Sequence, residues 1–399
     1  MNKESSRRGG PRAALARFLT NERWTQITVP IFCIILTLIV SAVVLLVLGK
    51  KPGTAFYSFL AGNGFLQKAN YGSGSGMISD FFSFLNIMAP MLLAALAFIF
   101  GYRCGLFNIG ISGQMLLSGY VATVFIGYSE LPGAVARPLV LIVGIIVGGL
   151  AGAFIGFLKY RFNIHEVVST IMVNYIISYV TAFRINLKYI DMISRSSKTI
   201  SSAARLTFTK VQIAGCNCNI PLGIIIAILA AILVHFVFEK TVFGFELRAV
   251  GSNRNAALYT GVNVGKQMIS AMMISGMLAG LAGVTYYLGY TNTIIPRELV
   301  SMGYDSIATA LLGNNSPIGA IFSSVLITIF QNGASYMSSA VGVAKEIASV
   351  ITGILLLFSA CGGYFRRLAA NYLRKLADEE EEAKKAAAAM AAEKGGEDK

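Results

Sequence analysis

Charged residues are scarce in this chain of 399 residues: Asp, Glu, Lys and Arg make up 13% of it, against about 25% in soluble domains. Long stretches therefore carry no charge, among them Phe32–Leu48, Ile87–Tyr102 and Pro138–Leu158. A helix needs about 20 mainly apolar residues to cross a roughly 30 Å hydrocarbon layer. One such run fits the core of a soluble domain, but many of them predict an all-α polytopic membrane protein.

Cysteine and histidine are also rare. The five cysteines are scattered, and Cys216 and Cys218 stand too close in sequence for an unstrained disulfide. We therefore expect no metal and no cofactor. The formal charge of +14 resides in the loops between apolar segments, where membrane topology already requires Lys and Arg, so we expect no nucleic-acid partner.

The chain lacks an energy source of its own. A phosphate loop has four residues between its glycines and a Ser or Thr after the Lys, whereas Gly261–Gln267 has three residues and a Gln. Ion-driven pumps place acidic residues inside the membrane; here Asp305 lies in a weak segment and Glu166 at a predicted helix start. These absences favour a protein driven from outside, with ion-coupled secondary transport of a small polar solute as the alternative.

The apolar pattern predicts about ten transmembrane segments, with one short or broken helix near 303–313. The segments are 29–48, 82–101, 110–128, 138–158, 166–186, 221–238, 266–289, 303–313, 317–336 and 343–361. An even number places both termini on one side, and the arm carrying Lys3, Arg7, Arg8, Arg12, Arg17 and Arg23 predicts that this side is cytoplasmic. The expected domains are a basic arm 1–28, a transmembrane domain 29–361 and a charged cytoplasmic tail 362–399, either a frayed helix or disordered.

Glycine recurs every four residues in one predicted span. Gly144, Gly148, Gly152 and Gly156 would line one face of a helix, and a second predicted span repeats the spacing at Gly276 and Gly280. Small residues at this spacing let helix backbones approach closely in membranes. We expect these glycines to form packing seams between helices rather than functional sites.

The cytoplasmic loop 239–265 alternates apolar and charged residues and then predicts a short helix, Asn255–Thr260. Asn253 or Asn255 can cap this helix, and Gly261 can end it. A structured, amphipathic loop is a suitable handle for a motor, but from its chemistry alone an ordinary connector is equally possible.

Gly110–Gly113 matches the G-x-S-G pattern around the nucleophile of rhomboid-like intramembrane proteases. Such an enzyme needs a base within reach of Ser112, and His165 and His235 are the two histidines of the chain. Proteolysis through Ser112 therefore stays open as a further alternative, although short Gly/Ser patterns arise easily by chance.

Three stretches carry a family resemblance. The sequence Arg248-Ala249-Val250-Gly251-Ser252-Asn253, with Ala256, Ala257 and Gly261, resembles the coupling segment of ABC importer permeases of the ribose and branched-chain amino acid type. Gly105–Gly110 with Gly113 and Gln114, Leu158–Phe162 with Glu166–Tyr175, and Gly303–Ala308 with Leu312–Asn314 resemble the nucleoside-importer branch. Members of that branch often have Glu where Ser112 stands.

This resemblance implies a permease subunit, not an enzyme, forming half of a path for nucleosides, with purine nucleosides favoured. It implies a second permease, a cytoplasmic ATPase and an extracytoplasmic substrate-binding lipoprotein as partners, in a bacterial plasma membrane and in contact with its lipid. The residues implied for ATPase coupling are Arg248, Ala249, Gly251, Asn253, Ala256, Ala257 and Gly261.

Four neutral amides are candidates for the translocation path: Asn108, Gln114, Asn174 and Asn314. A neutral amide is costly to bury without a partner, and its donor and acceptor can hydrogen-bond to bases and sugar hydroxyls. The alternative is that these amides tie helices together across the bundle.

Overall fold

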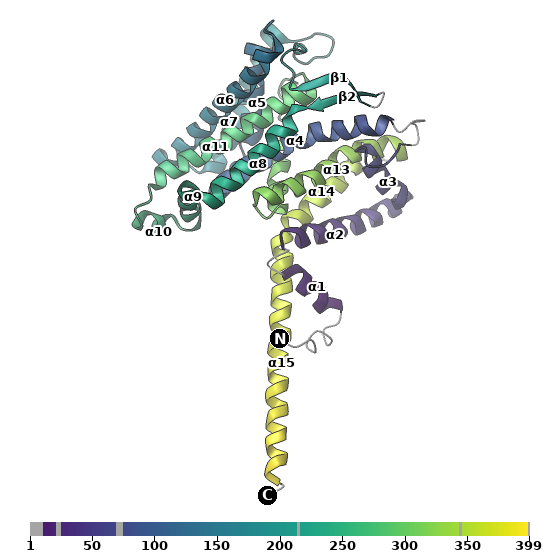
Figure 1. Ribbon diagram of the computed structural model, residues 1–399, viewed down its shortest axis with the longest axis vertical. Coiled ribbons are helices and arrows are strands. Elements are labelled where there is room, and N and C mark those ends of the chain that lie inside the picture. The colour runs from purple at the N-terminus through teal and green to yellow at the C-terminus, as the bar shows by residue number, and fades with distance from the viewer. Residues whose placement is uncertain (1–10, 21–24, 69–74, 214–215, 343–344, 398–399) are drawn as a thin grey trace.

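The computed structural model describes residues 11–20, 25–68, 75–213, 216–342 and 345–397. It is a bundle of helices with a small hairpin at one end and one helix extending far from the body (Figure 1). Within these ranges, six helices are long and apolar enough to cross a membrane. The all-helical, polytopic prediction is confirmed at this level, while the count of about ten spans is not.

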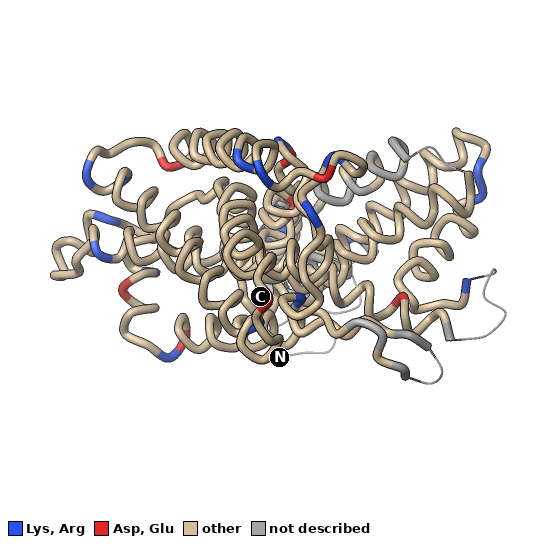
Figure 2. Tube along the Cα trace, turned by 90° about the horizontal axis from the view of Figure 1, so that it is seen from above, with Lys and Arg blue, Asp and Glu red and all other residues tan. Residues whose placement is uncertain are grey.

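The six long helical segments contain α4 (Ser75–Arg103), α6 (Gly133–Phe162), α7 (Glu166–Arg184), α8 (Leu222–Lys240), α11 (Val264–Thr285) and α13 (Pro317–Val341). The other apolar segments form the helices α2 (Thr25–Val47), α5 (Ile111–Ala122), α12 (Met302–Leu312) and α14 (Lys345–Ala360). The short helix expected near 303–313 is therefore present as α12. Figure 2 shows long stretches of these helices without Lys, Arg, Asp or Glu.

Helix α4 is the centre of the bundle. Its most apolar stretch is 89% buried, and it packs against α8, α11, α12 and α13. Such a helix needs apolar side chains on every face, since no side of it meets water. The run from Met91 to Phe100 meets this requirement, and every one of its side chains is buried.

The glycine seam joins α6 to α11. A methyl group added to Gly148 would collide with the carbonyl oxygen of Gly276, and one added to Gly276 would collide with that of Gly148. Gly152 and Gly280 are equally close to backbone atoms of the facing helix. The predicted packing seam is confirmed, and because only hydrogen atoms separate the two backbones, α6 and α11 form the most intimate helix pair of the bundle.

Three helices end in π-helical turns at the end of the bundle that carries the hairpin: η1 (Thr123–Gly127) after α5, η2 (Ile185–Tyr189) after α7 and η3 (Tyr286–Thr291) after α11. The hairpin pairs β1 (Thr207–Ile213) with β2 (Cys216–Pro221), antiparallel. These strands, and helix α3 (Pro52–Gly62), lie in the long connections between predicted membrane segments, residues 187–220 and 49–81. The hairpin is held by the Leu206 N–H, which donates to the Leu288 carbonyl at 2.9 Å.

Both terminal regions are helical where the structure describes them. Helix α1 (Pro11–Thr20) belongs to the predicted basic arm, of which Lys3, Arg7, Arg8 and Arg23 lie outside the described residues. Helix α15 (Gly362–Glu397) agrees with the helical one of the two alternatives expected for the charged tail. Its 36 residues extend it about 54 Å, and its first turns pack beside α1 (Figure 1).

Candidate functional site

The turn between α4 and α5 positions the first candidate amide. Gly105 has φ +74°, a left-handed conformation that favours glycine, and it lets the chain leave α4 sharply. Three residues later the Asn108 Oδ1 accepts a hydrogen bond from the Gly110 N–H at 2.9 Å. The side chain is fully buried, so the turn delivers a fixed amide into the interior of the bundle.

Asn108 connects three helices from this position. Its Nδ2 donates to the Gln114 Oε1 of α5 at 3.2 Å and to the Ser275 Oγ of α11 at 2.9 Å. The Ser275 hydroxyl in turn donates to the Ala97 carbonyl of α4 at 2.6 Å. A polar chain therefore runs from α5 through the turn to α11 and the central helix.

Asn174 of α7 joins the same turn from the other side. Its Oδ1 accepts from the Gly113 N–H at 3.0 Å, and its Nδ2 donates to the Ile109 carbonyl at 3.1 Å. Gly113 makes this approach possible, because a side chain there would collide with the Asn174 amide. The Asn174 amide thus supplies a hydrogen-bond partner to the backbone at the start of α5, inside the bundle.

We call Asn108, Gln114, Asn174 and Ser275 the amide cluster. All four are buried, and most of their polar atoms are paired within the described part of the chain. The exception is Gln114, whose Nε2 has no hydrogen-bond acceptor among the described residues. An unpaired buried donor costs about 1–3 kcal/mol, so this amino group is the member of the cluster best placed to gain from a passing ligand.

The fourth candidate, Asn314, lies apart from the amide cluster. It follows α12 in a turn with φ +53° and is exposed. The neighbouring Asn315 carbonyl accepts a hydrogen bond from the Arg103 Nε at 3.0 Å. Asn314 is therefore near the end of α4, at the α9–α10 end of the bundle.

The predicted coupling loop forms two helices, α9 (Val242–Ser252) and α10 (Arg254–Tyr259). Helix α9 was not expected. Asn253 separates the two helices with an extended backbone, and its Oδ1 accepts from the N–H groups of Asn255 and Ala256 at 3.0 and 3.1 Å. The predicted cap at Asn253 is confirmed, as is the end of α10 before Gly261, which has φ +85°.

Gly251 connects the coupling segment to the end of α4. A methyl group at this position would collide with the Arg103 carbonyl oxygen, so the two backbones are in direct contact. The Arg254 Nη2 donates to the Gly105 carbonyl at 3.1 Å. The contact lies within five residues of Asn108 along the chain, which makes the segment Arg103–Asn108 a short physical link between α9 and the amide cluster.

Some of the remaining residues implied for ATPase coupling are buried, and others are exposed. Ala257 is buried, while Ala256 is exposed, and the Ala249 carbonyl accepts the Asn253 N–H at 3.1 Å. Arg248 lies 3.5 Å from Glu239, both partly exposed, which contributes little to stability. Beside them, α9 and α10 expose four apolar side chains, Val242, Phe245, Leu258 and Tyr259, the last being 91% exposed.

Four further residues that the sequence analysis singled out make hydrogen bonds or ion pairs that stabilise the fold. The Ser112 hydroxyl donates to the Val300 carbonyl at 2.9 Å, and His165 caps α7 by accepting from the Val167 N–H at 3.3 Å. Glu166 begins α7 and pairs with Lys159 at 2.9 Å, as expected of a helix start. Asp305 of α12 accepts from the Gln331 Nε2 of α13 at 2.8 Å.

Sequence reasoning missed two members of these arrangements, Ser275 and Arg103. Ser275 is a polar residue beside Gly276 in an apolar span, which was the available signal for an interhelical hydrogen bond. Arg103 carried no comparable signal, because its role depends on a contact with Gly251 far along the chain.

A bundle of apolar spans with a buried polar cluster, linked to an exposed two-helix segment at one end, defines a polytopic permease. The chain belongs to the family described as branched-chain amino acid transport system / permease component, whose profile matches residues 81–360. Membership of a transport family disfavours the protease interpretation of Ser112.

The chain is similar to permeases along most of its length. It is 36% identical over 356 residues to the guanosine ABC transporter permease protein NupP of Bacillus subtilis, covering 89% of this chain and 98% of that protein. It is 31% identical to the nucleoside ABC transporter permease protein NupB of Lactococcus lactis, covering 85% and 92%. A second Bacillus subtilis guanosine permease protein, NupQ, is 28% identical and covers 71% and 90%. No solved structure gives a significant match.

Proposed function

We propose that this chain forms half of the translocation path of an ABC importer for nucleosides, with purine nucleosides as the favoured cargo. The observation that carries the proposal is the likeness to NupP and NupB, which extends over 89% and 85% of this chain. The amide cluster supports it, because neutral amides offer both donors and acceptors to a nucleoside without the cost of burying a charge.

The proposed topology has ten membrane segments, adding α2, α5, α12 and α14 to the six long helices. Helix α12 has 11 residues, about 16 Å of helix, and so would cover only half of the membrane, with the non-helical residues 292–301 before it completing the crossing. Both termini and α9–α10 would be cytoplasmic, with the hairpin outside. The terminal arm 1–28 and the tail 362–399 would then share the side of the coupling segment.

The cytoplasmic partner is an ATPase that binds α9 and α10. Exposed apolar side chains such as Phe245, Leu258 and Tyr259 are unfavourable in water and suit an interface with another protein. Movement of α9 would act on the end of α4 through Gly251 and reach the amide cluster through Gly105 and Asn108. This chain of direct contacts is the proposed mechanism by which ATP hydrolysis changes access to the path.

Two further partners complete the proposed importer. Bacillus subtilis NupP and NupQ are both named as guanosine permease proteins, and Lactococcus lactis NupB and NupC as nucleoside permease proteins. This pairing supports a second, different permease as the other half of the path. A substrate-binding lipoprotein would dock on the outer face, where the loop 187–220 carries Lys188, Arg195, Lys198 and Arg205.

The test is uptake by the complete system in proteoliposomes, with ATP inside and the binding protein outside. We expect radiolabelled guanosine to accumulate only with ATP, and leucine not to accumulate. Accumulation of leucine instead would contradict the cargo. Uptake without ATP that collapses when a proton or sodium gradient is removed would contradict the ABC mechanism and favour ion-coupled transport.

A further inference from the structure

A cavity of about 310 Å³ lies between α1, the start of α2 and the first turns of α15. Its walls are mainly apolar and include Leu15, Leu19, Phe32 and Phe365. Phe32 and Phe365 meet edge to face with ring centres 5.4 Å apart. The cavity is open along one side, so it is a groove rather than a part of the packed core.

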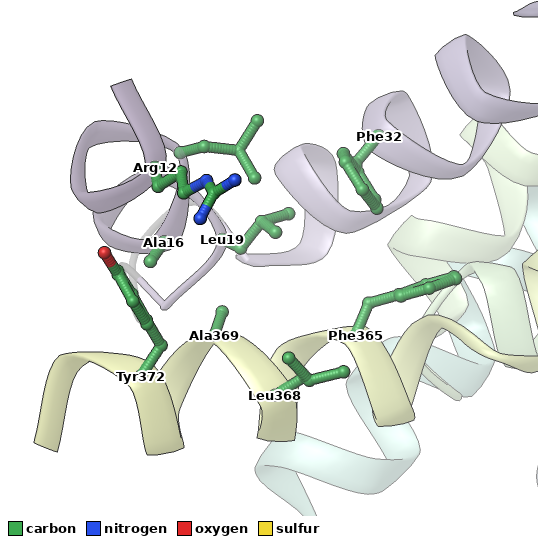
Figure 3. A pocket seen from close by; sticks show the side chains of 9 residues that line it. Arg12, Ala16, Leu19, Phe32, Phe365, Leu368, Ala369 and Tyr372 are labelled. Carbon is green, nitrogen blue, oxygen red and sulfur yellow. The ribbon is translucent and has the colours of Figure 1, made fainter. Parts of the chain in front are cut away.

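The groove is polar at one end and aromatic at the other. Figure 3 shows Arg12 and Tyr372 together at one end, and Phe32 and Phe365 at the opposite end. Phe32 belongs to the apolar stretch of α2 that begins at Ile31. The aromatic end therefore points toward the membrane-embedded part of the chain, and the polar end away from it.

The two helices α1 and α15 that form the groove are rich in basic residues. Helix α1 carries Arg12 and Arg17, both exposed, and has no acidic residue. The first part of α15 exposes Arg366, Arg367, Arg374 and Lys375, and its first acidic residue is Asp378. Each basic side chain near a membrane surface strengthens attraction to anionic lipid. The groove thus combines apolar walls with Arg12 in its lining and further exposed basic residues on the same helices.

Helix α1 also has the character of an interfacial helix. Leu15 and Phe18 are each 49% exposed, while Ala16 and Leu19 are buried against α15. A short helix with exposed apolar side chains and arginines is suited to the boundary between headgroups and acyl chains. An exposed leucine and phenylalanine beside an apolar groove would be unfavourable in bulk water.

We propose that this groove binds an anionic phospholipid of the cytoplasmic leaflet, with one acyl chain between Leu19, Phe32 and Phe365. The phosphate would accept hydrogen bonds from the Arg12 guanidinium and the Tyr372 hydroxyl. The proposal rests on the cytoplasmic placement of the termini given above, and not on the nature of the cargo. It makes the junction of α1, α2 and α15 sensitive to the lipid composition of the inner leaflet.

The experiment uses the full chain reconstituted into phosphatidylcholine vesicles. The chain has one tryptophan, Trp24, so Trp24→Phe with Phe32→Trp places a single fluorescent reporter in the groove. A minor fraction of either phosphatidylglycerol or phosphatidylcholine carries brominated acyl chains, which quench tryptophan on contact. Arg12→Gln removes the proposed phosphate ligand, and Arg17→Gln is the matched control with equal charge loss on the same helix.

We expect brominated phosphatidylglycerol to quench more strongly than brominated phosphatidylcholine. Arg12→Gln should weaken that preference about tenfold, the loss of one hydrogen bond to a charged group, while Arg17→Gln retains most of it. Inorganic phosphate should not reverse the quenching. Equal quenching by the two lipids would overturn the proposal, as would an equal loss in both variants, which would indicate diffuse surface attraction.

A second measurement needs no substitution. When the unmodified chain is purified from a mixed-lipid membrane, native mass spectrometry should detect retained phosphatidylglycerol in preference to phosphatidylcholine. Retention of neither lipid would contradict the proposal even if the reporter variant failed to insert. Both measurements use this chain without cargo or partner subunits. The nucleoside assignment can therefore be contradicted while lipid binding is confirmed, and lipid binding can be contradicted while the nucleoside assignment is confirmed.

Discussion

Gly251 of α9 lies directly against the carbonyl oxygen of Arg103 at the end of α4, with no room for a single methyl group between them. Helix α4 is the most buried helix among the six long ones. The contact therefore joins the coupling segment, which exposes Val242, Phe245, Leu258 and Tyr259, to the centre of the bundle. Packed interiors respond to such contacts by switching between arrangements rather than by deforming smoothly.

Gly251→Ala should uncouple the importer. The added methyl group must displace α9 from α4, and overpacking of this kind costs about 1–3 kcal/mol. We expect cargo-stimulated ATP hydrolysis by the purified complex to fall about tenfold, the effect of 1.4 kcal/mol. Gly53→Ala, where an added methyl group meets no atom within 4 Å, is the control. Wild-type stimulation in Gly251→Ala would remove this contact from the mechanism.

Asn253→Ala should fray α10. The substitution removes the acceptor for the N–H groups of Asn255 and Ala256, and loss of such a cap costs about 1 kcal/mol. Hydrogen exchange of the α10 amides should become faster, and the ATPase should bind more weakly. Asn253→Ser retains an acceptor and should restore both properties. Unchanged exchange in the Ala variant would show that α10 is held by its tertiary contacts instead.

The glycine seam offers a matched pair of adjacent positions on α6. A methyl group at Gly148 would meet the Gly276 backbone, whereas one at Gly149 would meet the flexible side chains of Met277 and Met273. We expect Gly148→Ala to destabilise the protein by about 1–3 kcal/mol and Gly149→Ala to have a much smaller effect. Thermal unfolding in detergent measures both. Equal losses of stability in the two variants would mean that α6 and α11 move apart easily to accommodate the methyl group at position 148.

Two substitutions in the amide cluster separate a role in stability from a role in cargo binding. Asn174→Ala leaves the Gly113 N–H and the Ile109 carbonyl without partners, which should cost about 1–3 kcal/mol of stability. Gln114→Met is similar in shape and removes both the unpaired Nε2 and the Oε1 acceptor of Asn108, whose Nδ2 still donates to Ser275, so stability should fall less than in Asn174→Ala. If Gln114 contacts cargo, the KM of uptake should rise about fivefold, the loss of roughly one hydrogen bond. An unchanged KM would assign Gln114 to packing alone.

The sequence was sufficient for properties that depend on neighbouring residues or on period. Apolar runs predicted the membrane helices, glycines at intervals of four predicted the seam, and Asn253 with Gly261 predicted the limits of α10. Each of these follows from hydrogen bonding or packing within one or two turns of helix. Local rules failed for α9, for which no cap or period was recognised, and they left a helix and disorder as alternatives for α15, which has no continuous apolar face.

Only the tertiary structure decided which of the candidate amides meet. Asn108 and Ser275 are 167 residues apart, and Gly113 and Asn174 are 61 apart, so their contact depends on how each helix is rotated and placed against its neighbours. The same packing put Asn314 in an exposed turn away from the cluster, and brought Gly251 to Arg103. Residue types determined that this chain enters a membrane; the packing of its helices determined where its polar groups converge.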